Sequence, residues 1–372
     1  MQVAVIGNSP TNAGANVAAD LALAGRSVRF ARWSEAEADF DAIRKAGGIR
    51  VEGDAAHLVS GRLGLAQPEL SDDPARAVAG ADLVVLDLVP AELEARIRTI
   101  APALSPRHIV HVNTCSYWSA LRAATLLREQ VREGLTLTEI IAPTTTADLK
   151  GALLRTKWLR GQLPVAAFPA NRSPQALETM RVVYPGLRAA ANVLETSYAN
   201  LNMLVHAAVA LINVGWFDRA KEAGEDTDFW MGGSTAHAGI LGEAQDQERR
   251  RVSEAFGVRW ASTAEHLGKT YGGPATSFRE AIRGCAFYRS LPKRSPEMWR
   301  RWLAADIPMA HVPFAALAAL AGTPVPLHDA YITTFSALLG RDFRTEGLTL
   351  GQLGLDGMSK EDVAEFVTIG DR

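Results

Sequence analysis

The sequence predicts an α/β protein with two domains: a doubly wound, mainly parallel sheet over residues 1–196 and a mainly α-helical domain over residues 197–372. Three observations lead to this prediction. The chain of 372 residues is longer than chains that fold around a single hydrophobic core usually are. Strand and helix patterns alternate in its first half, as a parallel sheet with crossover helices requires. From about Tyr198 onward, long amphipathic helices separated by short Gly and Pro segments replace this alternation.

The beginning of the chain reads as a strand, a turn, a helix and a second strand. Apolar Gln2–Ile6 is followed by a polar loop that begins at Gly7 and ends at Gly14. The Ala-rich stretch Ala15–Ala24 then leads to a second apolar run, Ser27–Phe30. This is the first unit of a Rossmann-type dinucleotide-binding domain, in which a pyrophosphate lies at the helix N-terminus because the helix dipole favours negative charge there.

The loop of this unit departs from the usual G-x-G-x-x-G fingerprint. It is about two residues longer, and Ser9-Pro10-Thr11 stands where the second glycine is expected. We expect the two glycines to flank a phosphate-binding turn whose extra residues bulge outward and whose amides near residues 11–13 are the donors. An ordinary polar loop is the alternative. The candidate cofactor residues in this loop are Gly7, Ser9, Thr11, Asn12, Ala13 and Gly14.

The remaining elements follow in order along the chain. In the first domain, helices are expected over residues 35–46, 74–78, 92–100, 119–132 and 173–184. Strands are expected over residues 49–52, 82–88, 108–113, 136–141, 153–159, 163–168 and 187–194. In the second domain, helices are expected over residues 201–220, 236–256, 262–267 and 313–320. The cofactor is expected at the carboxyl ends of the parallel strands and the substrate between the domains.

Charge and composition exclude several classes of partner. The formal net charge of −2 and the pI of about 6.5 remove the electrostatic case for a nucleic acid or an anionic membrane. The apolar segment 201–217 contains two Asn and one His and is short for a membrane span. The two cysteines suit a reducing compartment, and the histidines show no metal-ligand spacing, so no metal is predicted. Because no signal-peptide pattern is found, we expect a cytoplasmic protein.

The charge run over residues 248–251 belongs to one of the predicted helices. Asp246 and Arg250 stand four residues apart, which is the spacing of a surface ion pair on a helix. We therefore interpret this run as a solvated helix face.

Arg32 follows the second strand, at the position that distinguishes the two nicotinamide dinucleotides. An acidic residue there holds the ribose 2′-hydroxyl of NAD, whereas an arginine accommodates the 2′-phosphate of NADP. A guanidinium group forms paired hydrogen bonds to phosphate, and Arg32 or Trp33 is suited to stacking on the adenine. The sequence therefore favours NADP(H) over NAD(H), with an ordinary surface arginine as the alternative.

The apolar helix predicted from Leu201 to Trp216 carries three polar side chains in register. At about 100° per residue, Asn202, His206 and Asn213 point within roughly 40° of one another. Polar groups buried on an apolar face cost free energy unless something satisfies them, so the stripe indicates a site. A satisfied core histidine and two helix-packing amides are the alternative interpretation.

Several short motifs lie in a fixed order along the chain. They are Ala18-Ala19-Asp20-Leu21-Ala22 with Gly25, Val89-Pro90-Ala91, Asn113, Glu139, LPVAAFPA from Leu163, Asn202-x-x-x-His206 with Asn213, Asp306-Ile-Pro308, Val312-Pro313, GRDFRTEG from Gly340 and LGLDGMS from Leu353. In this order and spacing they resemble the octopine/nopaline dehydrogenase family, the opine dehydrogenases, along nearly the whole chain.

The resemblance implies a reaction and a catalytic pair. Members of that family join an amino acid to an α-keto acid by reducing the imine between them with a nicotinamide cofactor. Their catalytic histidine and aspartate map to His206 and Asp306, which we expect to share a hydrogen bond. A histidine titrates in the range useful for moving a proton at the imine nitrogen, and a carboxylate on its other ring nitrogen fixes the tautomer. A helix N-cap is the alternative role for Asp306.

The resemblance also implies further contacts, and the chain departs from the family pattern in places. The implied cofactor contacts are Val89, Pro90 and Asn113, and the implied substrate contacts are Asn202, Asn213, Arg301 and Tyr117. Arg301 is the candidate clamp for a substrate carboxylate, with a solvated arginine as the alternative. Apart from the longer loop, Ala305 replaces the glutamate that precedes the aspartate, and Thr114-Cys115-Ser116-Tyr117 stands where N-P-G-R is common.

The leading hypothesis is an NADP-dependent opine-type dehydrogenase whose partners are an amino acid or amine and an α-keto acid, with a homodimer as one option for its assembly. Two alternatives use the same architecture. One is a ketopantoate-reductase-like enzyme that reduces a ketone to a hydroxy acid. The other is a catalytically silent NADP-binding sensor, against which the retention of both His206 and Asp306 argues.

Overall fold

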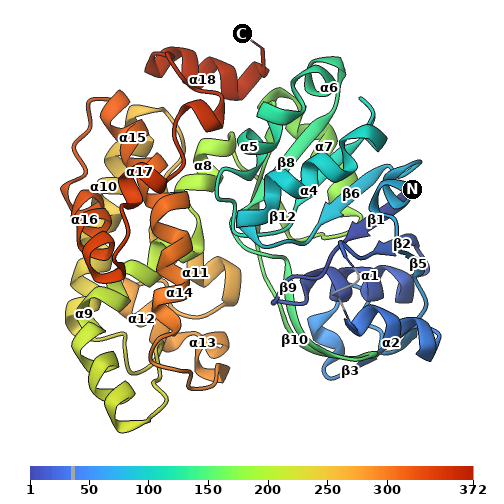
Figure 1. Cartoon of the computed structure of the whole chain (residues 1–372), viewed down its shortest axis with the longest axis horizontal. Helices are drawn as coiled ribbons and strands as arrows, with labels where there is room; N and C mark the ends of the chain where they lie inside the picture. Colours follow the sequence, from blue (N-terminus) through green and yellow to red (C-terminus); the bar gives the residue numbers. More distant parts are fainter. Residues whose placement is uncertain (35–37, 372) are drawn as a thin grey trace. The chain divides into compact units, whose positions relative to one another are not determined.

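The computed structural model describes residues 1–34 and 38–371, which form two compact units (Figure 1). The first unit comprises Met1–Val193 together with Glu365–Arg372, and the second comprises Leu194–Ala364. The sequence places the domain boundary after residue 196, whereas the compact units divide after Val193, and residues 365–372 belong to the first unit. The last helix, α18 (Lys360–Ile369), brings Phe366 to a ring-centroid distance of 5.2 Å from Phe168, so the end of the chain packs with the first unit.

An eight-stranded sheet forms the centre of the first unit. Its strand order is β12-β11-β8-β7-β6-β1-β2-β5, and all neighbours are parallel except the antiparallel pair β8 and β11. The strands are β1 (Gln2–Ile6), β2 (Ser27–Ala31), β5 (Glu69–Ser71), β6 (Leu83–Leu86), β7 (Ile109–Val112), β8 (Thr136–Ile140), β11 (Leu163–Phe168) and β12 (Leu187–Ala189). The predicted doubly wound, mainly parallel sheet is confirmed.

The order of the strands identifies where a ligand binds in such a sheet. The chain proceeds from β1 outward to β2 and β5, and then crosses to β6 on the other side of β1. Ligands of doubly wound sheets bind at this reversal, beside the carboxyl ends of the strands. The central strands β6 and β7 are buried along their whole length, as the Val- and Leu-rich runs of an internal parallel strand require.

Helices cover this sheet much as the sequence predicts. They are α1 (Ala13–Leu23), α2 (Ala38–Ala46), α3 (Pro74–Val78), α4 (Leu93–Ile100), α5 (Ser119–Leu126), α6 (Arg128–Glu133) and α7 (Ser173–Arg181). Short 3₁₀ turns lie at Ala55–His57, Pro90–Glu92, Ala101–Ala103 and Ala170–Arg172. The helix expected over residues 119–132 is divided at Leu127, and residues 35–37 of the helix expected over 35–46 lie outside the described residues.

A second sheet of four strands was not anticipated from the sequence. Its order is β4 (Gly64–Ala66), β3 (Ile49–Glu52), β10 (Leu153–Leu159) and β9 (Thr145–Lys150). The strand expected over residues 153–159 therefore pairs with β3 and β9, outside the main sheet. Its side chains alternate between buried and exposed, whereas β11 is buried throughout, which is the pattern of a sheet with one solvated face. The strand expected over residues 187–194 ends at Ala189, because α8 begins at Val193.

The second unit is built from helices, so the predicted helical domain is confirmed. They are α8 (Val193–Tyr198), α9 (Leu201–Ala223), α10 (Ala236–Ala255), α11 (Thr263–Tyr271), α12 (Phe278–Gly284), α13 (Ala286–Ser290), α14 (Met298–Asp306), α15 (Val312–Leu320), α16 (Pro326–Leu339) and α17 (Phe343–Glu346), with a π turn at Ile307–His311 and a 3₁₀ turn at Gly351–Leu353. The long helix α9 begins where the Asn200 side chain accepts the amides of Asn202 and Met203. It ends at Gly224, whose φ of +69° suits glycine.

The charge run on α10 is a correction to the sequence interpretation. Asp246 and Arg249 are buried and form an ion pair of 2.7 Å, and Glu248 is buried as well. Within the run, Arg250 makes a surface pair, with Glu254 at 2.8 Å. Helix α10 packs on α9, α12 and α16, so charged residues on more than one of its faces are taken out of water.

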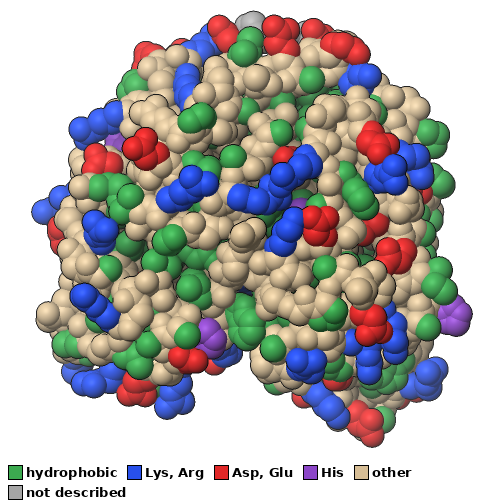
Figure 2. All heavy atoms as spheres, turned by 180° about the vertical axis from the view of Figure 1, so that it is seen from behind, with side chains coloured by type: hydrophobic (Ala, Val, Ile, Leu, Met, Phe, Trp, Pro, Cys, Tyr) green, Lys and Arg blue, Asp and Glu red, His purple; other side chains and the backbone are tan. Residues whose placement is uncertain are grey.

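The surface carries both signs of charge. Figure 2 shows Lys and Arg interspersed with Asp and Glu over one face, in keeping with the net charge of −2.

Two helical segments, Val193–Ala223 and Met298–Leu320, are long and apolar enough to cross a membrane by length and composition alone. Within the fold, 67% and 61% of these segments' most apolar windows are buried, as in core helices.

Candidate active site

His206 and Asp306 form a hydrogen-bonded pair inside the second unit. The imidazole Nδ1 of His206, on α9, lies 2.8 Å from Oδ2 of Asp306, the last residue of α14. Their side chains are only 7% and 2% exposed. A carboxylate can only accept a hydrogen bond, so Nδ1 donates and Nε2 is the nitrogen left to exchange a proton. Asp306 makes no side-chain cap and lies in continuous helical backbone, so the N-cap alternative does not describe it.

Aromatic rings hold the imidazole from its sides. The ring of Trp302 stacks on His206 at a centroid distance of 4.7 Å and an angle of 14°. Trp230 lies at 5.5 Å, and Phe229 meets the imidazole edge-on at 6.0 Å. Hydrogen bond and stacking together fix both the position and the rotation of the ring, which is what preorganised proton transfer needs.

A π turn begins directly after the aspartate. Residues Ile307–His311 form this turn, with Pro308 near its start, and α15 continues from Val312. Insertions of this kind in helices are rare and concentrate at functional sites. The turn therefore lies directly beside the aspartate that bonds to His206.

The three predicted substrate residues of this unit lie in different surroundings. Asn213 donates its amide to the carbonyls of Val209 and Gly233, at 2.7 and 2.8 Å. Both amide hydrogens are therefore used within the fold, which supports the helix-packing interpretation. Asn202 is half-buried in the first turn of α9. Arg301 is exposed and has no ion pair within the part of the chain that the structure describes, so its guanidinium is available to a carboxylate.

In the first unit, the two loop glycines are required by close approach. A Cβ on Gly7, whose φ is +84°, would lie 1.9 Å from the Trp33 indole nitrogen. A Cβ on Gly14 would lie 2.0 Å from the carbonyl oxygen of Gly7. The ends of the loop therefore touch, and the residues between them form a closed turn at the N-terminus of α1.

The extra residues of this turn are anchored, which differs from the expected outward bulge. The Thr11 carbonyl accepts the Ala147 amide at 3.1 Å, and the Asn12 side chain donates to the Ala147 carbonyl at 3.1 Å, so the turn is tied to β9. The Asn12 amide is used inside the turn, on the Ser9 carbonyl at 2.8 Å. Of the predicted donors, the Ala13 amide has no acceptor among the described residues.

Asp87, which sequence reasoning missed, joins the two sides of the turn. It follows β6, and its Oδ2 accepts the amides of Ser9 and Gly14 at 2.8 and 2.6 Å. Burial raises the pKa of this carboxyl to about 6, while hydrogen bonds from Ser9 and Gly14 oppose the rise. The backbone carbonyl of Asp87 also accepts the indole N–H of Trp33 at 3.1 Å. A carboxylate that interrupts the apolar run LVVLDLV was the available signal.

Arg32 is neither a surface arginine nor a free guanidinium. Its Nη1 lies 3.1 Å from Asp41 and its Nε 2.8 Å from Asp72, while its own side chain is only 10% exposed. Arg44 pairs with the same two carboxylates, at 3.1 and 2.6 Å. Two arginines and two aspartates thus share the position where a 2′-phosphate was expected. The aspartates were not foreseen, since neither is adjacent to Arg32 in the sequence.

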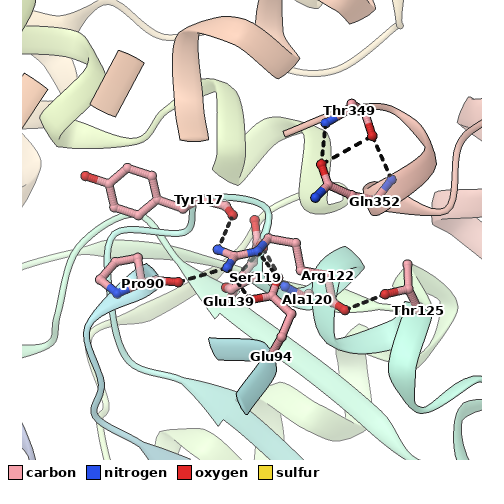
Figure 3. A network of polar contacts seen from close by, with 10 residues as sticks. All are labelled: Pro90, Glu94, Tyr117, Ser119, Ala120, Arg122, Thr125, Glu139, Thr349 and Gln352. Atoms are coloured by element: carbon pink, nitrogen blue, oxygen red, sulfur yellow. Dashed lines mark hydrogen bonds and ion pairs between the residues drawn. The ribbon is translucent and has the colours of Figure 1, made fainter. Parts of the chain in front are cut away.

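The carboxyl ends of β6 and β7 hold the other predicted contacts, and Arg122 organises them (Figure 3). Arg122 is buried on α5 and forms a two-point ion pair with Glu94, at 2.7 Å for each contact. It also donates to the carbonyls of Pro90, at 2.9 Å, and Tyr117, at 3.4 Å. Val89, beside Pro90, is 41% exposed. The Arg122 side chain thus bonds to both predicted contact segments, the one at Pro90 and the one at Tyr117.

Asn113 and Tyr117 lie on the segment that Arg122 supports. Asn113 is buried, and its Oδ1 accepts the Thr144 amide at 2.9 Å. Residues 116–118 all have positive φ, from 34° to 58°, although none is glycine. Such strain persists where the surroundings enforce it and concentrates at functional sites. The Tyr117 side chain is buried, so a substrate contact through it stays a prediction.

The residues of the first unit fit a nicotinamide dinucleotide. The turn between Gly7 and Gly14 lies at the N-terminus of an 11-residue helix, beside the reversal of strand order between β1 and β6. Both glycines leave room where backbone must approach a ligand. At the α1 N-terminus, the Asp87 and Asn8 side chains accept the amides of Gly14 and Ala15, while the Ala13 amide has no acceptor among the described residues. No group of His, Cys, Asp and Glu suited to a metal ion occurs within residues 1–34 and 38–371.

Comparison with known proteins identifies the family. The family model described as "NAD/NADP octopine/nopaline dehydrogenase, alpha-helical domain" matches residues 189–339. An opine dehydrogenase from Arthrobacter sp. (strain 1C) is 31% identical over 359 residues, which cover 96% of this chain and 96% of the relative.

Solved structures show the same fold. Octopine dehydrogenase in complex with NADH and agmatine has a TM-score of 0.77 at 18% identity, covering 100% of this chain and 98% of that one. Other structures of octopine dehydrogenase contain NADH with L-arginine or with pyruvate. A ketopantoate reductase from Ralstonia eutropha JMP134 has a TM-score of 0.58 at 19% identity, covering 91% of this chain and 99% of that one. The predicted resemblance is confirmed by the full-length relative, and the chain belongs to the octopine/nopaline dehydrogenase family, the opine dehydrogenases, which are NAD(P)-dependent oxidoreductases acting on a CH–NH group.

Proposed function

We propose that this protein reduces the imine formed between an amino acid or amine and an α-keto acid, with NADP(H) preferred over NAD(H). The proposal rests on the buried hydrogen bond between His206 and Asp306, in which the imidazole also stacks on Trp302. A ketone reductase and an imine reductase share the fold, but an imidazole held by a carboxylate is suited to acid/base work at nitrogen. The octopine dehydrogenase structures with agmatine, L-arginine or pyruvate support these substrate classes.

His206, Asp306 and Arg301 have different roles in this reaction. A reduced nicotinamide dinucleotide, when bound, supplies the hydride that adds to the imine carbon. His206 exchanges the proton at the substrate nitrogen through Nε2, so that the C=N double bond becomes a C–N single bond carrying one new hydrogen on each atom. Asp306 holds the ring and stabilises its charged form. Arg301 binds a substrate carboxylate, because its guanidinium is exposed and makes no ion pair with any described side chain.

The reaction class is tested by oxidation of NADPH and NADH with a panel of amino acids, amines and α-keto acids. We expect oxidation to require an amine and a keto acid together, because neither alone forms the imine. Oxidation by a keto acid alone would instead establish the ketone-reductase alternative. Cofactor binding without oxidation under any pair would establish the silent sensor. A homodimer, a cytoplasmic location and the lack of membrane or nucleic-acid partners stay predictions from the sequence.

The preference for NADP(H) rests on Arg32 and Arg44. The pKa of Asp72 is lowered, chiefly by its hydrogen bond from Arg44, so it competes as an anion for both guanidinium groups. Asp41 and Asp72 are exposed, with side-chain exposures of 61% and 54%, and can turn toward water when a 2′-phosphate takes their place. Arg32, being buried, stays in position.

Arg32→Ala should therefore weaken NADPH binding by at least about 1.5 kcal/mol, or more than about tenfold, and leave NADH binding nearly unchanged. Titration of each cofactor against the purified protein measures both constants. Arg29→Ala is a matched control, because Arg29 lies on β2, the strand that Arg32 follows, and pairs with Glu69 at 3.1 Å. Equal losses for NADPH and NADH in Arg32→Ala would contradict the preference.

A further inference from the structure

Asp87 takes a position that conflicts with the expected ligand. Its Oδ2 occupies two amides of the turn at the N-terminus of α1, Ser9 and Gly14. In a dinucleotide-binding unit, this turn is where the diphosphate is held. A buried carboxylate and a diphosphate at the same turn repel each other if both are charged.

The two carboxylate oxygens of Asp87 are in unequal environments. Oδ2 accepts both hydrogen bonds, whereas Oδ1 is buried and has no hydrogen-bond partner among the described residues. A proton on Oδ1 would therefore leave both contacts with the turn intact. The carboxyl group can change its charge without releasing the loop.

We propose that Asp87 braces the lengthened turn between Gly7 and Gly14, and that dinucleotide binding takes up a proton at its carboxyl group. The inference rests on dinucleotide binding and not on the imine chemistry. Although burial raises its pKa to about 6, the carboxyl of the free protein is mostly ionised near neutral pH. The negative charge of the diphosphate raises that pKa further, so the bound form carries more protons than the free form.

Several charged groups on the surrounding elements have partners of their own. The groups beside the carboxyl are neutral, namely the amides of Ser9 and Gly14 and the Ser9 hydroxyl. The titratable and charged side chains on the elements packed around it are Asp20 on α1, Arg29 on β2 and Arg32 after it, Asp82 before β6, Glu92, Glu94, Arg96 and Arg98 after β6, His108 before β7 and His111 on β7. Burial lowers the pKa of His111 to about 3, so it is neutral in this range. Asp20 accepts the amides of Val59 and Ser60, and Arg96 pairs with Glu92.

The sign of the effect follows from linkage. Because binding takes up a proton, affinity is highest at low pH and falls as pH rises through the pKa of the free protein. Above about pH 6, the Kd should rise by up to tenfold per pH unit until the bound form also ionises. The Kd stops rising once the pH exceeds the pKa of Asp87 in the complex.

The experiment titrates NADH against the wild-type protein between about pH 6 and 8.5, because the 2′-phosphate of NADPH titrates in this range and NADH carries none. Calorimetry in two buffers of different ionisation enthalpy counts the protons directly, and this readout needs no variant. We expect uptake approaching one proton near the middle of the range. Binding of NADH with a constant Kd and no proton uptake would overturn the inference while leaving the proposed function intact.

Asp87→Asn is the informative variant. Its amide oxygen can accept both backbone amides as Oδ2 does, and its NH₂ group replaces the oxygen that has no partner. We expect NADH to bind Asp87→Asn with little pH dependence and no proton uptake. Asp82→Asn, at the other end of β6, loses a carboxylate that also accepts a backbone amide, from Gln2 at 2.8 Å, and should keep the wild-type slope. A slope retained in Asp87→Asn would contradict the assignment, and absence of NADH and NADPH binding in the wild type would contradict the proposed function as well.

Discussion

Replacing His206 with alanine should lower turnover by roughly 10²- to 10⁴-fold, the range expected when acid/base catalysis is lost. The imidazole is held in place by Asp306 at 2.8 Å and by the stacked ring of Trp302, and alanine removes its Nε2. Cofactor binding should change little, because His206 lies in the helical unit, whereas the turn proposed to bind the dinucleotide lies in the first unit. Steady-state rates with a saturating amine and keto acid, together with cofactor titration, measure both quantities.

The paired aspartate supplies the stricter test. If Asp306 acts through His206, Asp306→Ala should cost turnover in the wild type and little more in a His206→Ala background. Independent losses that add in the double variant would show that the two side chains do not act as one unit. Asn213→Ala is a useful comparison, because its amide bonds to Val209 and Gly233 serve packing and should affect stability more than turnover. Near-normal turnover in His206→Ala would defeat the catalytic assignment itself.

Asp246→Ala should lower the free energy of unfolding of the helical unit by about 3–5 kcal/mol. Asp246 accepts hydrogen bonds from Arg249 at 2.7 Å, from the Thr263 amide at 2.7 Å and from the Thr263 hydroxyl at 2.8 Å. Both charged side chains are only 2% exposed, so removal of the aspartate leaves an uncompensated guanidinium in the interior. Denaturant unfolding, followed through the tryptophans of this unit, measures the loss.

A matched pair on the same helix controls for surface charge. Glu254→Ala breaks the exposed pair with Arg250 and should change the free energy of unfolding by less than about 1 kcal/mol. Asp246→Leu combined with Arg249→Met removes both buried charges and should recover much of the stability, since the cost in Asp246→Ala comes from one charge left alone. A loss in Asp246→Ala as small as that in Glu254→Ala would contradict the buried pair.

Several features of this protein were determined by local sequence. The order of apolar runs and helix patterns predicted the mainly parallel sheet, because a strand buried on both faces must be apolar throughout. The glycines at positions 7 and 14 predicted a tight turn, since a side chain at either would meet neighbouring atoms. The helical period placed Asn202, His206 and Asn213 on one stripe, and the spacing of motifs placed the chain in its family.

Tertiary structure decided what those patterns do. Asp87 reaches Ser9 from 78 positions away, and Asp72 reaches Arg32 from 40 positions away. The turn between Gly7 and Gly14 and the expected 2′-phosphate site therefore both contain carboxylates that no local pattern indicates. The same applies to β10, which pairs with β3, and to Arg249, whose charge is buried although the local spacing suggested a solvated face. Periodicity fixes which face of an element is apolar, but the partner of a polar group depends on strand order and helix packing, which join residues far apart in the chain.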